Sequence, residues 1–481
     1  MDLSYELKKR FGYDQFRPGQ EEVVQSILQQ ENTLAILPTG MGKSLCYQLP
    51  GEMLSGLVVI ISPLVSLMED QVASLRKRGE KRVAAINSFL PQEQRKQLFK
   101  DIHTIKFLFI SPEMLNRPDI GRFLTNLSIS ILVVDEAHCI SQWGFDFRPD
   151  YLRLGEFTRL AGNPPVLALT ATADQQVERD IIQYLQMTEA NVIRQSVDRP
   201  NLKYFVERLN SERDKTEWLK NRLTATSGPG IIYVSSRKRA EELTRILQQD
   251  GHQIASYHAG KEAGDRHIIQ QQFLSGELSW ICATNAFGMG VHKENIRQVI
   301  HDQLPASAAA YVQEAGRAGR DGNRSSAVLL YVEEDEQKVR FIVQNDLPEE
   351  SEVHHFVAMR KSGHTIEVSA ELAGISETSA RLIQYYSETL TIEDVLKTFT
   401  KLKYDKEEKL REMISYVSEN TCLREKLLFY FDEHISDRYD VCCSVCGIRS
   451  EDWLLNKSNV KNNRTLLNWE ERIELLLCPH S

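Results

Sequence analysis

The stretch that decides the fold is residues 131–152, which read ILVVDEAHCISQWGFDFRPDYL. Residues 131–134 form a short apolar run, which is typical of a strand buried in a parallel sheet. That strand delivers Asp135 and Glu136 to its carboxyl end, where open α/β sheets place their ligand crevices. The acidic pair is suited to metal and water chemistry, although it is equally compatible with a solvated strand end.

An aromatic segment follows the acidic pair, with rings at every second position. The alternating residues are Trp143, Gly144, Phe145, Asp146, Phe147 and Arg148. In an extended chain this period places the rings on one face. Such a face either stacks on flat bases or forms the core side of an edge strand, and the segment alone leaves both readings open.

Composition sets the outer bounds on the protein class. The chain has 481 residues, 42% hydrophobic and 26% charged, as in globular proteins of about two to four domains. Its net charge is −9, so any surface for a polyanion must be a local basic groove. No apolar run is long enough for a membrane span, and the N-terminus lacks a signal pattern. We therefore expect a cytoplasmic protein without membrane partners.

A glycine loop lies between a predicted strand and a predicted helix. Residues 33–37 (TLAIL) are strand-like, 38–44 read PTGMGKS, and helix-compatible residues follow. This is the context that a phosphate-binding loop requires. Leu37 stands where the longer form of the motif has glycine, so the match is to the shorter PTGxGKS form. The alternative is a tight strand–helix turn with an exposed lysine.

The residue types in this loop suit a nucleotide. Gly40 and Gly42 let the backbone approach phosphate, and the following helix N-terminus adds positive potential. Lys43 can reach the β- and γ-phosphates, and Ser44 can ligate Mg²⁺.

Strands and helices alternate through the first two thirds of the chain, which predicts parallel, doubly wound sheets. In the first half, strand-like runs lie in residues 57–63, 106–112 and 165–174. Hydroxyl residues lie near their ends, where capping and ligand contact are both plausible: Ser62, Ser111, Thr170 and Thr172. Residues 187–229 show no long apolar periodicity and read as a passage to a second domain.

The second domain repeats the alternation over residues 230–305 and ends in a helix expected around 309–322. Arg317 and Arg320 are predicted on one face of that helix. Two arginines so close repel each other unless an anion lies between them. The alternative is a surface pair balanced by acidic neighbours.

From about residue 341 the pattern becomes helical. Residues 364–388 suggest a helix–turn–helix around Gly374, a motif that reads DNA in some proteins and simply packs in others. A cysteine cluster follows, and four thiols in this spacing suit tetrahedral zinc: Cys422, Cys442, Cys443 and Cys446. Because two of these are adjacent, Asp440 or His434 is the substitute ligand if one thiol faces away.

Together these motifs resemble the RecQ family of superfamily 2 DNA helicases. The resemblance is carried by the following stretches, in family order: FGYDQFRPGQ (11–20), LPTGMGKSLCYQLP (37–50), VIISPLVSLMEDQV (59–72), FISPEML (109–115), DEAHCISQWGFDFRPDY (135–151), LALTATA (167–173), DRPNL (198–202), YVSSRK (233–238), YHAG (257–260), ATNAFGMGVHK (283–293) and QEAGRAGRDG (313–322).

The resemblance implies an architecture of two RecA-like doubly wound parallel-sheet lobes followed by a mainly helical zinc-binding domain. We expect the first, ATP-binding lobe in residues 1–195, the second lobe in 196–340, the helical and zinc-binding domain in 341–446, and a short tail in 447–481. The length after Cys446 suggests a short form without a full winged helix or a C-terminal helical domain.

The resemblance also assigns roles at an ATP site. Lys43, Asp135, Glu136, Arg317 and Arg320 would be catalytic, with Glu136 orienting the attacking water and Arg320 the principal arginine finger. Ser44 and Asp135 would hold Mg²⁺. The residues that would bind the nucleotide are Arg17, Gln20, Pro38, Thr39, Gly40, Met41, Gly42, Lys43, Ser44, Gly288 and Arg320. In this set Arg17 and Gln20 resemble an adenine-recognition pair, although residues at a helix start are often simply solvated.

For DNA, the implied activity is ATP-dependent 3′–5′ translocation on single strands and unwinding of duplex or branched DNA in recombination and repair. The residues expected to contact DNA or couple it to hydrolysis are Ser62, Gln142, Trp143, Phe145, Phe147, Arg148, Arg237 and His258. Zinc would be structural. We expect a monomer, associated with the nucleoid in a bacterium, whose partners include a single-stranded-DNA-binding protein. The alternatives are a nucleotide-switched DNA-binding or strand-annealing protein with weak unwinding, and an RNA helicase.

Overall fold

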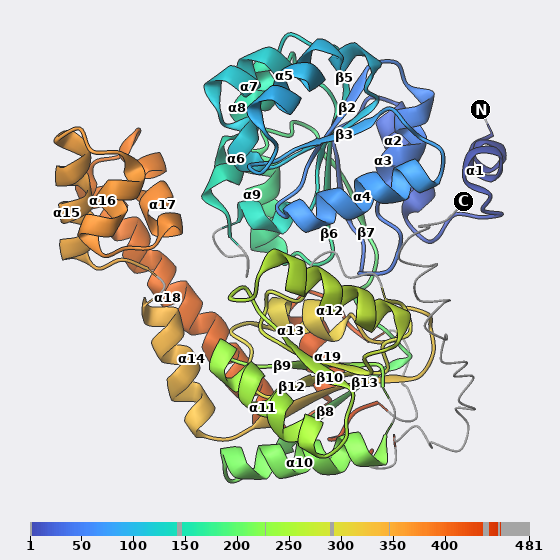
Figure 1. The fold of residues 1–481 in the computed structure, drawn as a ribbon, viewed down its shortest axis with the longest axis vertical. Helices are drawn as coiled ribbons and strands as arrows, with labels where there is room; N and C mark the ends of the chain where they lie inside the picture. The colour runs from blue at the N-terminus through green and yellow to red at the C-terminus, as the bar shows by residue number, and fades with distance from the viewer. Residues whose placement is uncertain are drawn as a thin grey trace.

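The computed structural model describes residues 2–141, 147–226, 228–288, 293–345, 347–435, 442–450 and 453. Two α/β lobes lie one above the other in Figure 1, with a group of helices to one side. Each lobe is built on one parallel sheet, so the predicted pair of doubly wound lobes is confirmed. No helix in the described ranges is long and apolar enough to cross a membrane.

The first sheet has seven strands in the order β3-β4-β2-β5-β6-β1-β7. Their bounds are β1 Thr33–Ile36, β2 Leu57–Ile61, β3 Val83–Ile86, β4 Phe107–Ile110, β5 Ile129–Val134, β6 Val166–Thr170 and β7 Asn191–Arg194. Successive residues of these strands enter two separate apolar cores, one on each face of the sheet. Both faces are therefore covered, which explains why the strands read as continuous apolar runs.

Within the described residues, nine α-helices and three 3-10 helices accompany this sheet. Their bounds are α1 Leu3–Phe11, α2 Gln20–Leu28, α3 Leu45–Met53, α4 Val65–Lys77, α5 Gln92–Lys100, η1 Ile102–Thr104, α6 Pro112–Leu115, α7 Pro118–Leu124, η2 Ala137–Ile140, η3 Pro149–Arg153, α8 Leu154–Leu160 and α9 Gln175–Tyr184. Because β5, β6 and β1 are neighbours, the loops that follow them meet at one edge of the sheet. That edge carries the acidic pair, the hydroxyls after β6 and the glycine loop.

The second sheet has six parallel strands in the order β10-β11-β9-β12-β13-β8. The strands are β8 Leu202–Arg208, β9 Gly230–Tyr233, β10 Ile254–Tyr257, β11 Trp280–Ala283, β12 Gln298–His301 and β13 Ser325–Tyr331, and the helices are α10 Glu212–Ala225, α11 Arg237–Gln249, α12 Ala263–Ser275, α13 Ala308–Ala315 and α14 Glu334–Asn345. The stretch 187–229, predicted as a mere passage, holds β7, β8 and α10. The sequence did not predict these strands because they lack a long apolar run: β7 is only partly buried, and β8 is buried over its first four residues alone.

The C-terminal region is helical, as predicted. It contains α15 Glu350–Lys361, α16 Ile366–Ala373, α17 Glu377–Ser387, α18 Ile392–Val417 and α19 Leu423–Phe429. Gly374 ends α16 at φ +72°, in the left-handed conformation that favours glycine, so the predicted helix–turn–helix is present. Its α17 packs on η3 of the first lobe. Of the two readings of this motif, DNA recognition and packing, the observed contact agrees with packing.

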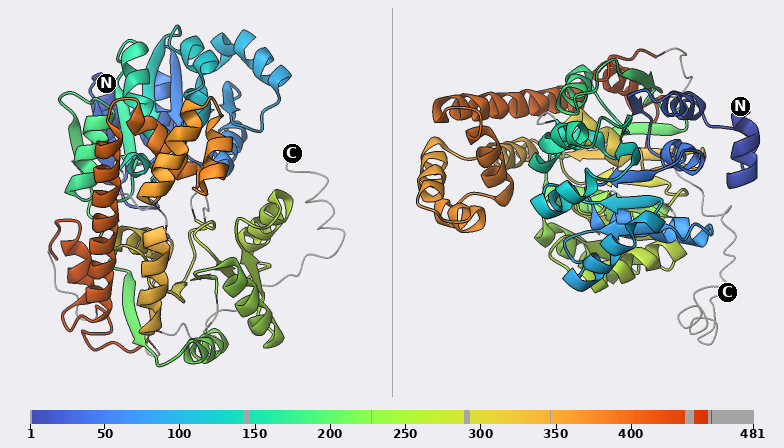
Figure 2. Two further views of the ribbon diagram at one scale, coloured as in Figure 1. Left: turned by 90° about the vertical axis from the view of Figure 1, so that its left-hand side faces the viewer. Right: turned by 90° about the horizontal axis from the view of Figure 1, so that it is seen from above.

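Helix α18 extends from the α15–α17 group toward the second lobe (Figure 2, left). Near its start, Val395, Phe399 and Leu402 belong to the same buried cluster as the first lobe. Near its end, Leu410 and Met413 belong to the main cluster of the second lobe. The C-terminal helices are therefore anchored in both lobes.

Candidate nucleotide site and zinc centre

The glycine loop leaves β1 and enters α3 with two glycines in left-handed conformations, Gly40 at φ +87° and Gly42 at φ +71°. Ser44 caps α3 without a side-chain hydrogen bond to the helix. The buried Nζ of Lys43 makes no hydrogen bond within the described residues and lies 3.7 Å from Glu136 Oε2. A buried amine beside turned backbone at a helix start fits a phosphate group.

Gln20 and Arg17 lie directly against this loop. The Gln20 amide nitrogen donates to the carbonyls of Met41 (2.7 Å) and Gly42 (3.0 Å), while its oxygen accepts from the Arg17 N–H (2.9 Å). The Arg17 guanidinium donates to the Gly40 carbonyl. The two residues are thus placed beside the predicted phosphate loop. In this structure the Gln20 amide, expected to contact adenine, is engaged by the loop backbone.

The acidic pair turns sharply at the end of β5. Glu136 has φ +48°, a left-handed conformation that is costly for a side chain other than glycine and common at functional sites. Burial and the neighbouring Glu136 charge raise the pKa of Asp135 to about 6. Burial opposes ionisation of Glu136 as well, but the charges of Lys43, His138 and the two arginines of the second lobe outweigh it and lower its pKa. Glu136 is therefore held as an anion at neutral pH.

A buried hydrogen-bonded path joins this turn to β6. His138 Nδ1 lies 3.0 Å from the Thr170 hydroxyl, which donates to the Thr172 carbonyl at 3.0 Å. His138 also lies 3.5 Å from the Glu136 carboxylate. The Thr170 hydroxyl also accepts from the Thr172 amide at 3.4 Å, so it caps the turn after β6 and links that turn to His138 after β5.

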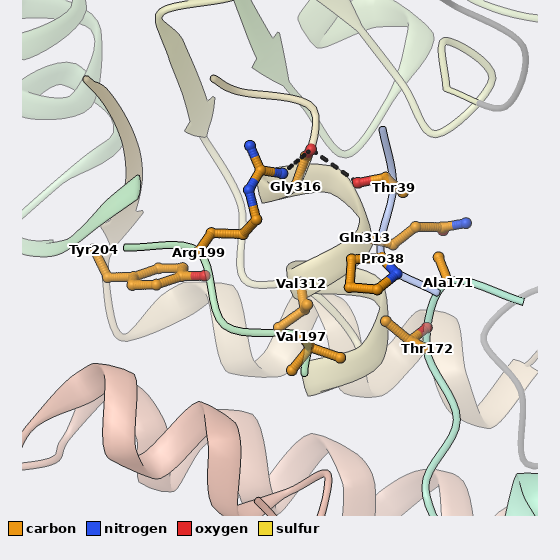
Figure 3. A pocket seen from close by; sticks show the side chains of 10 residues that line it. All are labelled: Pro38, Thr39, Ala171, Thr172, Val197, Arg199, Tyr204, Val312, Gln313 and Gly316. Carbon is orange, nitrogen blue, oxygen red and sulfur yellow. Dashed lines mark hydrogen bonds between the residues drawn. The ribbon is translucent and has the colours of Figure 1, made fainter. Parts of the chain in front are cut away.

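The second lobe closes on the glycine loop through the segment after α13. The Thr39 hydroxyl donates to the Gly316 carbonyl at 2.9 Å (Figure 3). Arg320 packs on the loop so closely that a side chain at Gly40 would meet its Cγ at 3.2 Å. Arg317 is buried and donates to the carbonyl of Gly288. Thr39 and Gly40 of the first lobe therefore adjoin the second-lobe turn that carries Arg317 and Arg320.

The arginine pair does not lie on a helical face, and this prediction was wrong. Helix α13 ends at Ala315, and the following residues form turns. Gly319 at φ +62° and Gly322 at φ +78° give the segment a left-handed backbone that a helix cannot accommodate. Burial and the charge of Arg317 lower the pKa of Arg320 to about 10, which is the repulsion expected without an anion between them.

One residue of the site was not among the predicted set. Arg199, in the DRPNL segment, reaches the Gly316 carbonyl that Thr39 also contacts (3.3 Å; Figure 3). Its only signal in the sequence was its place in the DRPNL stretch of the family resemblance, because its partners are backbone carbonyls more than 100 residues away.

The residues predicted to meet DNA in the first lobe divide into two groups. Ser62 is buried after β2, and Arg148 donates to the neighbouring Pro63 carbonyl at 2.7 Å. Phe147 packs against the first-lobe core. Of the two readings for this ring, base stacking and core packing, the contact agrees with core packing. Gln142, Trp143 and Phe145 lie outside the described residues.

In the second lobe, Arg237 begins α11 and His258 follows β10. The His258 ring lies 2.8 Å from the Glu241 carboxylate, which also pairs with Lys261 at 2.8 Å. Arg237 is exposed, and its guanidinium lies within van der Waals reach of a Cβ at Gly260. Arg237 and His258, both predicted to contact DNA, thus lie beside the same residue, Gly260, of the second lobe.

The cysteine cluster closes as predicted. One ligand atom from each of Cys422, Cys442, Cys443 and Cys446 lies within 4.8 Å of every other. Neither His434, which is exposed, nor Asp440, which lies outside the described residues, belongs to this group. Four thiolates suit zinc and leave no open position, so the donor set fits a structural ion.

The zinc knuckle rests on the second lobe. Cys443 forms a parallel bridge with Tyr204 of β8, and the Ser444 amide donates to the Tyr204 carbonyl at 3.0 Å. The buried Arg424 of α19 donates to Cys442 Sγ at 3.2 Å. The knuckle therefore extends the edge of the sheet at β8.

Comparisons with known proteins agree with this geometry. Residues 17–180 match the DEAD/DEAH box helicase family, residues 214–322 the helicase conserved C-terminal domain, and residues 381–447 the RecQ zinc-binding family. Two parallel-sheet lobes with a phosphate loop, an acidic pair and trans-lobe arginines define a superfamily 2 helicase class.

Relatives narrow this class. The chain is 43% identical to the probable ATP-dependent DNA helicase RecS of Bacillus subtilis, covering 92% of each protein. It is 34% identical to the ATP-dependent DNA helicase RecQ of the same organism (92% of this chain, 66% of the relative) and 41% identical to RecQ of Haemophilus influenzae (68% and 52%). The chain belongs to the RecQ family of ATP-dependent DNA helicases.

Solved structures share the fold at low identity. Mycobacterium smegmatis helicase Lhr bound to single-stranded DNA and AMP-PNP aligns with a TM-score of 0.58 at 20% identity, over 79% of this chain and 55% of that one. Saccharomyces cerevisiae Dbp5 bound to RNA and ADP BeF3 aligns with a TM-score of 0.58 at 18% identity, over 72% and 90%. The two-lobe arrangement is thus common to helicases of both nucleic acids.

Proposed function

We propose that this protein translocates 3′–5′ on single-stranded DNA and unwinds duplex or branched DNA in recombination and repair, driven by ATP hydrolysis. One observation carries the catalytic part: the glycine loop of the first lobe contacts the arginine turn of the second lobe, where Thr39 donates to the Gly316 carbonyl and Arg320 packs on Gly40. A site assembled from both lobes makes hydrolysis depend on how the lobes meet, which is the requirement for a motor.

Each residue then has a task. Lys43 and the backbone of residues 38–44 hold the phosphates, and Ser44 with Asp135 would hold Mg²⁺. ATP, when bound, supplies the γ-phosphoryl group whose transfer to water releases the energy. Glu136, kept ionised by its basic neighbours, orients that water and accepts its proton.

Arg320 supplies trans-lobe charge to the developing phosphoryl, with Arg317 beside it. An arginine finger contributes about 10³–10⁵ in rate where one is used. Because Arg320 packs on Gly40, opening of the lobes would withdraw it from the phosphates. Hydrolysis would therefore be limited to the closed arrangement.

DNA would lie across both lobes. Its proposed path passes Ser62, Arg148, Arg237 and His258, with Gln142, Trp143, Phe145 and Phe147 in the coupling segment. Ser62 is buried in this structure, so it would have to become exposed to contact DNA. Since one chain supplies both halves of the site, we propose a monomer as the active unit. A single-stranded-DNA-binding protein in the nucleoid would present its substrate.

The alternative is a nucleotide-switched DNA-binding or strand-annealing protein. The test is strand displacement on 3′-tailed, 5′-tailed and forked duplexes, with DNA-stimulated ATPase measured in parallel. We expect displacement of the 3′-tailed and forked substrates only. Hydrolysis without displacement would favour the alternative, displacement from a 5′ tail would reverse the polarity, and equal stimulation by RNA would point to an RNA helicase.

A further inference from the structure

Arg199 lies in the segment between the two sheets and faces the turn that follows α13. Its guanidinium donates to three successive parts of that turn, the carbonyls of Gly316 (3.3 Å), Ala318 (3.2 Å) and Gly319 (2.5 Å). A planar fork of five N–H donors can satisfy several acceptors at fixed angles, which an ammonium cannot do. The side chain therefore fixes the shape of the turn.

The turn held in this way carries both trans-lobe arginines. Gly319 is pinned from a second direction, because Asn201 Nδ2 donates to its carbonyl at 2.8 Å. A side chain at Gly319 would meet Ser325 Oγ at 2.2 Å, so only glycine fits at this position of the turn. Arg320 follows directly. Its place on the phosphate loop thus depends on contacts made by the DRPNL segment.

The Gly316 carbonyl is shared between the lobes. It accepts from Arg199 and from Thr39 of the phosphate loop, as Figure 3 shows. The same guanidinium that shapes the arginine turn therefore also shapes its contact with the nucleotide loop.

The backbone that carries Arg199 is itself held by Arg424. The Arg424 guanidinium donates to the Arg199 carbonyl at 2.9 Å, to the Leu202 carbonyl and to the Asp198 carboxylate. Its Nε donates to Cys442 Sγ at 3.2 Å. A continuous series of hydrogen bonds thus leads from a predicted zinc ligand to the turn that bears Arg320.

We propose that Arg199 is a positioning residue for Arg320, and that Arg424 couples this position to the zinc knuckle. The inference rests on the proposed function, since it requires Arg320 to act on the nucleotide. Neither arginine needs to touch ATP: Arg199 acts by holding carbonyls, and Arg424 acts by holding the backbone of Arg199.

The first experiment uses the full chain and measures ATP turnover at saturating oligo(dT) for Arg199→Met, Arg199→Lys, Arg320→Ala and the Arg199→Met/Arg320→Ala double variant. We expect Arg199→Met to lower kcat about 100-fold, the loss typical of a misplaced catalytic group, with KM for ATP nearly unchanged. Arg199→Lys should not restore turnover, because it keeps the charge and loses the fork. Arg213→Met on α10 is the matched control and should retain full turnover.

The double variant separates positioning from general damage. If Arg199 acts through Arg320, the double variant is no slower than Arg320→Ala alone. Multiplying losses, or full rescue by Arg199→Lys, would overturn the inference. Full turnover by Arg320→Ala would instead refute the proposed role of the arginine turn, so the two failures are distinguishable.

The second experiment tests the link to the knuckle through metal content as well as rate. Arg424→Met removes the donor to Cys442, and such outer contacts change metal affinity or activity by about 10–100-fold. We expect kcat to fall about tenfold while the zinc content of the purified protein stays at one per chain and fluorescent-nucleotide binding stays unchanged. Unchanged kcat, or a loss that only follows zinc loss, would overturn the coupling.

Discussion

Arg381 on α17 lies 2.7 Å from the Asp150 carboxylate on η3, which joins the C-terminal helices to the first lobe next to the aromatic segment. The contact is reinforced beside it, where Arg153 pairs with Glu388 at 2.6 Å and lies over the Tyr385 ring. Asn116 donates to the same Asp150 from the first-lobe side (3.1 Å). The α15–α17 group is therefore docked by specific charges, on a segment directly connected to residues 142–146.

Removal of this pair should loosen the dock without unfolding the lobes. Arg381→Ala is expected to increase hydrogen exchange of α17 and η3, because a partly exposed pair is worth up to about 1 kcal/mol. The swapped variant Asp150→Arg/Arg381→Asp should restore part of the protection. Arg411→Ala, which removes an exposed pair within α18, serves as the control. Unchanged exchange in Arg381→Ala would mean that apolar packing alone holds the group.

Lys43→Ala should abolish ATP hydrolysis. Loss of a charge aimed at the reacting group typically costs about 10²–10³ in kcat, and Glu136 would also lose the positive charge that does most to lower its pKa. Phosphate release at saturating ATP and DNA measures the effect. Lys81→Ala, a substitution of an exposed lysine, should hydrolyse normally. Appreciable turnover by Lys43→Ala would show that the loop is not the phosphate site.

Zinc should be present at one ion per chain and should depend on all four thiols. Cys446→Ala is expected to lose the ion and lower the melting temperature, because metal binding contributes directly to folding free energy. Cys282→Ala, at a buried cysteine of β11, should destabilise the protein yet keep its zinc. Metal analysis of both variants tests the knuckle, and zinc-free wild-type protein would exclude it.

The sequence was most informative where chemistry is local. The glycine loop, the acidic pair and the four cysteines were all identified from residues close together in the chain, and the structure brings each set together. The parallel, doubly wound sheets followed from the alternation of strands and helices, but the order of the strands within each sheet was not predicted. Strands β3, β7, β8 and β13 were not identified, since short strands carry little periodicity.

Long-range contacts could not be read from the sequence. Arg199 bonds to carbonyls, which any residue provides, so nothing in the sequence marks its partners. Arg381 and Asp150 are separated by 231 residues, and each also looks like an ordinary surface charge. Arg317 and Arg320 were wrongly predicted on a helix because i,i+3 spacing occurs in both helices and turns. In the structure α13 ends at Ala315, and the positive φ of Gly319 is incompatible with a helix.

Trp143→Ala should reduce DNA-stimulated hydrolysis more than DNA-independent hydrolysis. Trp143 lies outside the described residues, but the segment returns to the described structure at Phe147 and Arg148, and Arg148 contacts the residue after Ser62. Stacking on one aromatic ring is worth about 1–3 kcal/mol per base in single-strand binders. ATPase rates measured without DNA and across a titration of oligo(dT) give the DNA-independent and the DNA-stimulated rate separately. An equal loss of both rates would assign the ring to the core.

The contacts of Glu241 with Lys261 and His258 should make a pH-dependent contribution to stability. Hydrogen bonds from Lys261, and then from His258, lower its pKa to about 2, against about 4.3 in an unfolded chain. Because the folded pKa is depressed, the stabilisation is present above about pH 4.3 and is lost as pH falls toward 2. Glu241→Gln should thus lower the urea midpoint at pH 7, with the deficit shrinking below pH ~4.3.

The effect of Glu241→Gln should be modest, below about 1 kcal/mol, because the side chain is 52% exposed and its charge is screened. Glu371→Gln on α16 removes an exposed carboxylate and should show no pH-dependent difference. A deficit for Glu241→Gln that stays constant down to pH 3 would mean that shape, not charge, holds the His258 contact.

Helix α18 is a rod of about 39 Å at 1.5 Å per residue. Its start packs on α15 and α17, of which α17 docks on the first lobe, and its end lies in the core of the second lobe. Such a connection would limit the relative rotation of the lobes and oppose their separation along the helix axis. The relative motion of the two lobes during ATP hydrolysis would then have few degrees of freedom, and helix α18, which lies outside the nucleotide site, would set them. Glycine at both Tyr404 and Asp405, near the middle of α18, would weaken the helix there and let its two halves bend relative to each other.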